Sequence, residues 1–252
     1  MKYIKENWKF LLFLIIVGII GSIFTTIYSF DSIDPKLMEE AIKQVGSKEL
    51  IMIVSIIQTI IMYVVVCGVL GIILSNKVGL WKKIKFEKNK LLVIIIISII
   101  GGLFLSSGDL FIFGSFNEII KQSYDLKPSI EYIISSFTYG AVIEEVMMRL
   151  FFMSLISLII FKLFYKKEKN IPVKVFVFAN IVSATLFALG HLPATIQLFG
   201  GLDLLLFIRC LTLNGIFGLV FGWLYRKYGI QYSMLAHFGC HLISKLIWLM
   251  FI

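Results

Sequence analysis

The chain has 252 residues, of which 59% are apolar and 15% charged, and its mean hydropathy is +0.96. These values exclude a soluble globular enzyme or binding domain and indicate an integral membrane protein. The net charge of +9 would suggest nucleic-acid binding in a soluble protein, but here the lysines gather at the ends of apolar runs, as juxtamembrane residues do. We therefore expect the lipid bilayer as a partner and no nucleic acid.

Seven apolar segments are long enough to span a bilayer. In chain order they cover residues 10–30, 51–75, 91–114, 129–165, 172–193, 203–226 and 230–251. The first segment is too long for a signal-peptide core and no small-residue cleavage pattern follows it, so we expect it to be retained. No polar block is long enough for a soluble domain. The pattern predicts an all-α, polytopic bundle of seven to eight transmembrane helices in a single membrane domain, residues 1–252.

The distribution of basic residues predicts the orientation of these spans. If they alternate from a cytoplasmic N-terminus, most of the 24 Lys and Arg residues fall inside, including the lysine-rich stretches at 77–90 and 162–174. The few lysines on the other side are diluted by Asp and Glu. The positive-inside rule therefore predicts a multi-pass protein with a cytoplasmic N-terminus.

The fourth segment is longer than one span requires. A helix of about 35 residues would extend about 52 Å, against a hydrocarbon core of about 30 Å. Two interpretations remain open. The segment breaks into two helices at "TYG" (138–140), or it projects into the cytoplasm through the basic, amphipathic stretch 161–170.

Three charges lie in the middle of this segment, in "EEVMMR" (144–149). Glu145 and Arg149 are four residues apart, in the orientation that favours an ion pair. Glu144 is rotated by about 100° from them and has no local partner. We interpret Glu145 as structural or orienting and Glu144 as free to accept a proton, as a general base does. The alternative is that both glutamates only tie helices together.

The three histidines of the chain all lie in or at the end of spans. His191 ends "FALGH", and His237 and His241 stand one turn apart on one helix face, the spacing by which two imidazoles reach one metal or substrate group. A single intramembrane histidine more often bonds one helix to another. Together with Glu144, however, these three offer a base, a donor for an oxyanion and a means to hold water.

Other polar and small residues are given smaller roles. Gly215, Gly218 and Gly222 form a small-residue face, in which Gly218 and Gly222 have the four-residue spacing that lets helices approach closely. Asn214 is a candidate supporting hydrogen-bonder in the cavity, although a contact between helices is the alternative. Three further charged residues lie near span ends, are expected to snorkel to the interface and are assigned no chemistry: Arg209, Lys245 and Asp109.

These motifs resemble those of a known family. "EEVMMR" matches EExxxR, "FALGH" (187–191) matches FxxxH, and "HFGCH" (237–241) stands in the place of HxxxN. In this order on three helices, they resemble the CPBP family of intramembrane proteases, which includes CAAX prenyl endopeptidases and the bacterial Abi proteins of bacteriocin processing and self-immunity. The resemblance makes residues 129–252 the expected catalytic helices. Residues 1–128, the N-terminal spans, match only in being hydrophobic.

The resemblance implies a role for each motif residue. Glu144 would activate the hydrolytic water, His191 would hold or share that water, and His237 would help to stabilise the oxyanion. Glu145 and Arg149 would support the site. The residue at position 241 would assist His237, and here the chain departs from the family, which usually has Asn and sometimes Asp where this sequence has His241.

The departure at position 241 bears on metal binding. A histidine side chain, unlike that of asparagine, can titrate near neutral pH, and His241 brings a possible zinc-ligand set of Glu144, His191, His237 and His241 closer to completion. The resemblance allows both a metalloprotease and a metal-independent, glutamate-based mechanism. Because there is no HExxH helix and the carboxylates are adjacent, we expect no obligatory cofactor, with zinc as the alternative.

Three functions follow, in order of preference. The first is an endopeptidase that uses a glutamate-activated water on a membrane-associated or lipidated peptide or protein, in a bacterial plasma membrane. The second is a catalytically silent immunity or scaffold protein. The third is a transporter that relays protons through Glu144 and the histidines, against which stands the lack of an evident inverted repeat. The oligomeric state and the choice among prenylated proteins, leader peptides, bacteriocins and pheromone precursors stay open.

Overall fold

Helices form all the regular structure of residues 2–252, the part of the chain that this computed structural model describes. Seven helical runs are long and apolar enough to cross a membrane: Trp8–Ser32, Lys48–Lys77, Lys88–Phe113, Ile130–Phe164, Val173–Phe199, Leu204–Tyr228 and Ile230–Phe251. These runs confirm the predicted spans, and the fifth extends further than expected. The protein is therefore a multi-pass integral membrane protein with an all-α fold.

Several runs contain π-helical segments, in which hydrogen bonds join residues five apart. The N-terminal elements are α1 (Lys2–Glu6), α2 (Trp8–Ser32), α3 (Pro35–Val45), α4 (Lys48–Gln58), η1 (Thr59–Val69), α5 (Leu70–Lys77), α6 (Lys88–Leu103), η2 (Phe104–Phe113) and α7 (Glu118–Ser123). The C-terminal elements are α8 (Ile130–Ser135), η3 (Ser136–Glu144), η4 (Val146–Met153), α9 (Ser154–Phe164), α10 (Val173–Gly190), α11 (Leu192–Phe199), α12 (Leu204–Cys210), η5 (Leu211–Gly215), α13 (Ile216–Tyr228) and α14 (Ile230–Phe251).

Short polar side chains begin several of these helices. Asp34 accepts a hydrogen bond from the Lys36 backbone N–H at 2.8 Å to start α3, and Ser129 accepts one from Tyr132 at 3.2 Å to start α8. Asp203 does the same for Leu206 at the start of α12. These caps satisfy N–H groups that a helix cannot pair internally. They fix the points at which the chain turns back between spans.

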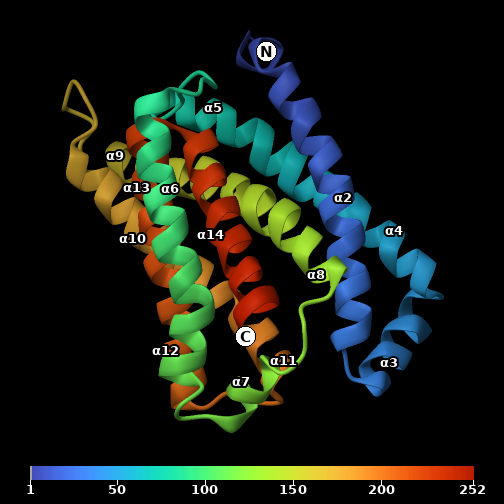
Figure 1. The fold of residues 1–252 in the computed structure, drawn as a ribbon. Coiled ribbons are helices and arrows are strands. Elements are labelled where there is room, and N and C mark those ends of the chain that lie inside the picture. Colours follow the sequence, from blue (N-terminus) through green and yellow to red (C-terminus); the bar gives the residue numbers. More distant parts are fainter. Residues whose placement is uncertain (1) are drawn as a thin grey trace.

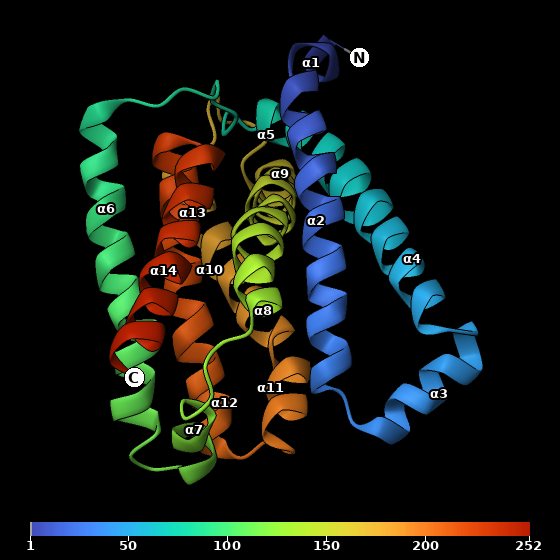
Figure 2. The ribbon, with the colours of Figure 1, turned by 45° about the vertical axis from the view of Figure 1, so that its right-hand side comes forward.

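The spans alternate between two ends of the bundle (Figure 1). The N-terminus lies at the same end as the α5–α6 and α9–α10 connections, which carry the lysine-rich stretches, whereas α3, α7 and α11 lie towards the other end (Figures 1 and 2). Helix α14 packs against α6, α13 and η3, and α10 packs against α13. The basic loops thus share one end, as the alternating topology requires.

The fourth span is one continuous helical run of 35 residues, Ile130–Phe164. The predicted break at "TYG" is wrong, because residues 138–140 lie inside η3 and the chain continues through η4 into α9. Helix α9 ends at Phe164, and residues 165–172 form the connection to α10. Gly140 is buried inside the helix, so it serves packing there and does not form a turn.

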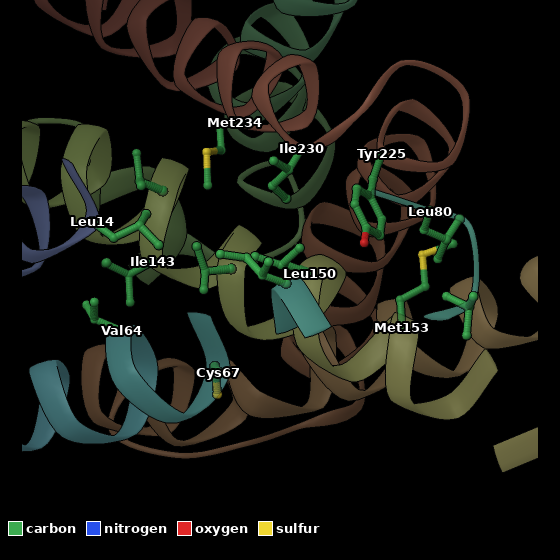
Figure 3. Packing of buried hydrophobic residues seen from close by; sticks show 14 of the residues in the cluster. Leu14, Val64, Cys67, Leu80, Ile143, Leu150, Met153, Tyr225, Ile230 and Met234 are labelled. Carbon is green, nitrogen blue, oxygen red and sulfur yellow. The ribbon is translucent and has the colours of Figure 1, made fainter. Parts of the chain in front are cut away.

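The largest buried apolar cluster surrounds this fourth span (Figure 3). It joins residues of the first, second and fourth spans to residues of α13 and α14: Leu14, Val64, Cys67, Ile143, Leu150, Met153, Tyr225, Ile230 and Met234. Lipid is as apolar as these side chains, so in a bilayer the cluster stabilises the fold chiefly through close packing. The segment with the three charges is thereby held at the centre of the bundle.

The expectation that Asp109 and Arg209 snorkel is wrong. Asp109 is 1% exposed, and Arg209 donates to it from Nε at 2.7 Å and also from Nη2. The Tyr124 hydroxyl donates at 2.9 Å to Asp109 Oδ2, the oxygen that also accepts from Arg209 Nη2. Burial and the neighbouring Asp109 carboxylate raise the pKa of Tyr124. The cluster therefore ties the third span to the sixth.

Candidate active site

Glu145 forms the buried centre of a polar network. Its side chain is 0% exposed, and its Oε1 lies 3.0 Å from His237 Nδ1 and 3.3 Å from Arg149 Nη1. The Ser233 hydroxyl donates to its Oε2. A carboxylate only accepts hydrogen bonds, so the proton of this pair sits on His237 Nδ1. Glu145 thus contacts Arg149, as their spacing in the sequence predicts, and also the His237 ring.

Arg149 locks this network to two other helices. Its side chain is 1% exposed, its guanidinium carbon lies 4.6 Å from the Phe187 ring centroid and 5.8 Å from that of Phe221, and its Nη2 donates to the Gly218 carbonyl at 3.1 Å. Cation–π contacts of a desolvated guanidinium contribute about 2 kcal/mol or more. The small-residue face of α13 packs against α10, and a Cβ at Gly218 would stand 3.0 Å from Ala184 Cβ and 3.3 Å from Arg149 Nη2.

The ring of His237 is fixed on both faces. It stacks on Phe221 with centroids 4.6 Å apart and on His241 with centroids 4.8 Å apart. Because Nδ1 is held by Glu145, the opposite ring nitrogen, Nε2, is the one available for substrate chemistry. This arrangement orients the imidazole before any substrate binds.

Glu144 points away from this network, towards His191. Its Oε1 lies 3.8 Å from His191 Nε2, and the two side chains are 17% and 33% exposed. His191 Nδ1 lies 2.8 Å from the Phe187 carbonyl, which accepts its proton, so Nε2 of the neutral ring is an acceptor. The pair therefore presents two acceptors side by side at the more open part of the site.

His241, the fourth residue predicted to be catalytic, lies beside Gly140 and close to Glu144. A Cβ at position 140 would stand 3.3 Å from His241 Nε2 and 3.9 Å from Glu144 Oε2. His241 and Glu144 therefore share the space beside this glycine. Phe187 contacts both His191 and His237, with centroid separations of 4.7 Å and 6.2 Å. The four residues predicted to be catalytic thus gather from three spans into one cluster.

Two residues that line this cluster, Ser233 and Gly140, were not predicted as site residues. A third residue, Asn214, was predicted to support the site and makes a different contact. Ser233 and Gly140 stand one turn before His237 and Glu144 respectively, a spacing that places each on the face of the motif residue. Asn214 donates to the Cys210 carbonyl of its own helix run at 2.9 Å. The amide nitrogen of Asn214 is thus engaged within its own helical run.

The donor atoms of this cluster do not converge as a metal site. Within residues 2–252, no group of three or more His, Cys, Asp or Glu side chains is placed to hold one ion. His237 Nδ1 is taken by Glu145, and the rings of His237 and His241 lie in a stack. Ligands of a zinc ion point instead at one centre about 2 Å from each. In this arrangement, the four residues do not fit a zinc ion.

The comparisons with known proteins bear on the same region. Residues 127–243 match the family described as Rce1-like, type II CAAX prenyl endopeptidase. The matched range contains all three motifs, from Glu144 to His241, and starts close to the predicted boundary at 129. Searches of curated proteins and of solved structures found no significant match. Residues 127–243 of this chain are thus similar to the Rce1-like type II CAAX prenyl endopeptidase family.

Proposed function

We propose that the protein is an intramembrane endopeptidase in which Glu144 activates the attacking water. The single observation that carries this mechanism is the Glu144–His191 pair, whose two acceptors lie 3.8 Å apart. That separation exceeds a direct hydrogen bond. It suits one water molecule that donates a proton to each acceptor, which aims an oxygen lone pair at a substrate carbonyl.

The proposed reaction follows from the atoms available. The water oxygen bonds to the carbonyl carbon while its proton passes to Glu144. The resulting tetrahedral intermediate collapses as Glu144 returns the proton to the leaving amine. Hydrogen bonds to the oxyanion come from His241 Nε2, in the tautomer that carries a proton there, and from His237 Nε2 when that ring is fully protonated. Glu145 stabilises this charged ring, since it already accepts from Nδ1.

The substrate follows from the family and the membrane. A peptide or prenylated protein held at the bilayer is the class that CAAX prenyl endopeptidases act on, and we extend it to other lipidated or membrane-associated peptides. We also propose that the N-terminus is cytoplasmic and that the membrane is a bacterial plasma membrane. The lysine-rich loops lie at the same end of the bundle as the N-terminus, which supports this orientation (Figure 2).

The decisive experiment measures cleavage of quenched fluorescent peptides, prenylated and leader-type, by the full chain in liposomes. We expect cleavage of at least one class and no loss of rate after treatment with a strong chelator, because the four residues do not converge on one ion. Loss of activity that zinc alone restores would contradict the metal-independent mechanism. No cleavage of any peptide would overturn the proposal and favour the silent immunity or scaffold protein.

Gly140→Ala tests whether the space beside Glu144 is part of the site. The added Cβ would press on His241 Nε2 at 3.3 Å, and displacing a catalytic group by even a few tenths of an ångström weakens its alignment. We expect kcat to fall by about tenfold with an unchanged thermal unfolding midpoint. The matched control is Gly215→Ala, whose Cβ would meet only Ala188 at an ordinary 3.7 Å. Equal rates for the two variants would show that this space is not used.

A further inference from the structure

A groove on the outer surface of the bundle lies between α10 and α13, two helices that pack side by side (Figures 1 and 2). Its volume is about 180 Å³, whereas one water molecule takes about 30 Å³ in the liquid. Val177 and Ile181 in its wall are 48% and 49% exposed, so the groove opens towards the bilayer. None of the residues proposed to be catalytic lines it. The lining includes Val177, Asn180, Ile181, Leu219, Trp223 and Arg226.

One end of this groove is positively charged. Arg226 and Lys227 lie in the last turn of α13, at the end of the bundle that carries the lysine-rich loops (Figure 2). Trp223 lies one turn earlier, and Lys227 Nζ stands 4.8 Å from its ring centroid. Tryptophan, lysine and arginine at the end of a span mark the level of the lipid headgroups. The groove therefore runs from headgroup level into the hydrocarbon region.

The positive charges at this end exceed the negative ones. Among residues 2–252, no Asp or Glu oxygen lies within ion-pair distance of Arg226 or Lys227. Lys82 donates to the Lys227 carbonyl, which adds a cation from the α5–α6 connection. Burial and the positive charges of Lys90 and Arg226 lower the pKa of Lys82, while Glu87 is already paired with Lys90 at 2.6 Å. Like charges held this close repel one another, and a bound anion relieves that repulsion.

A polar group lies deeper in the groove than these charges. Asn180 Nδ2 donates one of its two protons to the Leu219 carbonyl at 2.9 Å. A Cβ at position 222 would collide with Asn180 Oδ1, so the absence of a side chain at Gly222 leaves room for this amide. Gly222 precedes Arg226 by four residues, or about 6 Å along the helix. The second amide proton of Asn180 is thus available to an acceptor about one turn below the charges, such as an ester carbonyl.

We propose that the groove between α10 and α13 is a binding site for an anionic phospholipid. One acyl chain lies along Val177, Ile181 and Leu219, and the phosphate binds Arg226, whose planar guanidinium engages two phosphate oxygens at once. A zwitterionic lipid carries its own ammonium, which Arg226 and Lys227 repel, so the site prefers a headgroup with a net negative charge. The site is separate from the proposed catalytic cluster and does not depend on protease activity.

The first test measures thermal unfolding of the delipidated full chain in neutral detergent, with added phosphatidylglycerol or with phosphatidylcholine of the same acyl chains. For the wild type, we expect phosphatidylglycerol to raise the midpoint by about 5 °C or more and phosphatidylcholine to raise it by less than half as much. Arg226→Met should keep the lipid-free midpoint and lose the difference between the two lipids. Lys5→Met, which removes an exposed lysine of α1 at the same end of the bundle, is the matched control and should keep the difference.

The second test places the lipid in the groove. Native mass spectrometry of the chain in an equimolar mixture of the two lipids should show bound phosphatidylglycerol in excess by about tenfold. Ile181→Trp, which fills the groove, should abolish this excess, whereas Ile96→Trp at an equally exposed position of α6 should keep it.

Three results would overturn the site. Equal effects of the two lipids on the wild type would remove the preference for an anion. A preference that survives in Arg226→Met would reflect a general attraction to the lysine-rich loops. Equal binding by Ile181→Trp and Ile96→Trp would place the lipid elsewhere on the surface. Neither test measures cleavage, so each outcome is independent of the proposed function.

Discussion

Glu144→Gln is expected to lower kcat for peptide hydrolysis by about a thousandfold or more, since general-base catalysis contributes about 10²–10⁴ and no other free carboxylate faces His191 within residues 2–252. The amide has the shape of the carboxylate but cannot accept the proton of water. Glu144 makes no close ion pair, and its 3.8 Å separation from His191 exceeds a hydrogen bond. The thermal unfolding midpoint should therefore stay within a few degrees of wild type.

Two comparisons make this result specific. Glu118→Gln changes a carboxylate that is 66% exposed on α7, and it should leave the rate unchanged. Glu145→Gln should lower kcat as well, but it should also lower the unfolding midpoint, because Glu145 receives His237, Ser233 and Arg149 at a fully buried position. A variant Glu144→Gln with near wild-type kcat, beside an inactive Glu145→Gln that stays folded, would transfer the role of base to Glu145.

The spans were predictable because one physical property decides them. A run of apolar residues about 20 long has no better environment than a bilayer, so hydropathy alone located all seven. The ion pair of Glu145 with Arg149 was predictable for a similar reason, since helix geometry places residues four apart together. Both inferences depend only on local sequence.

What depended on contacts between distant spans was not predictable. Lys245 lies close enough to the end of α14 to reach the interface, and only the positions of Tyr132 and Trp248 show that it stays inside. Gly140 suggested a helix break, yet the neighbouring span supplies His241, which fills the space that a side chain would take. In both cases, the partner comes from another part of the chain and leaves no local pattern.

The network around Glu145 shows how the two kinds of information combine. The sequence places Ser233 and His237 one turn apart, but it does not show that both reach a carboxylate of the fourth span. Once they do, the four residues of this network form a buried set in which every member depends on the others. Removing one residue of such a network destabilises the folded protein. The effect is largest when the residue removed carries the charge that balances the buried carboxylate.

Arg149→Met is accordingly expected to destabilise the protein by about 3–5 kcal/mol, because it leaves Glu145 buried without its cation. The methionine fills most of the space between Phe187 and Phe221, so the loss reflects charge more than packing. Thermal unfolding in detergent micelles measures the effect, with Arg226→Met, which removes a partly exposed arginine at the end of α13, as the control. Adding Glu145→Gln to Arg149→Met should recover part of the lost stability, since it removes the unpaired charge. Additive losses in the double variant would mean that the two charges do not stabilise each other.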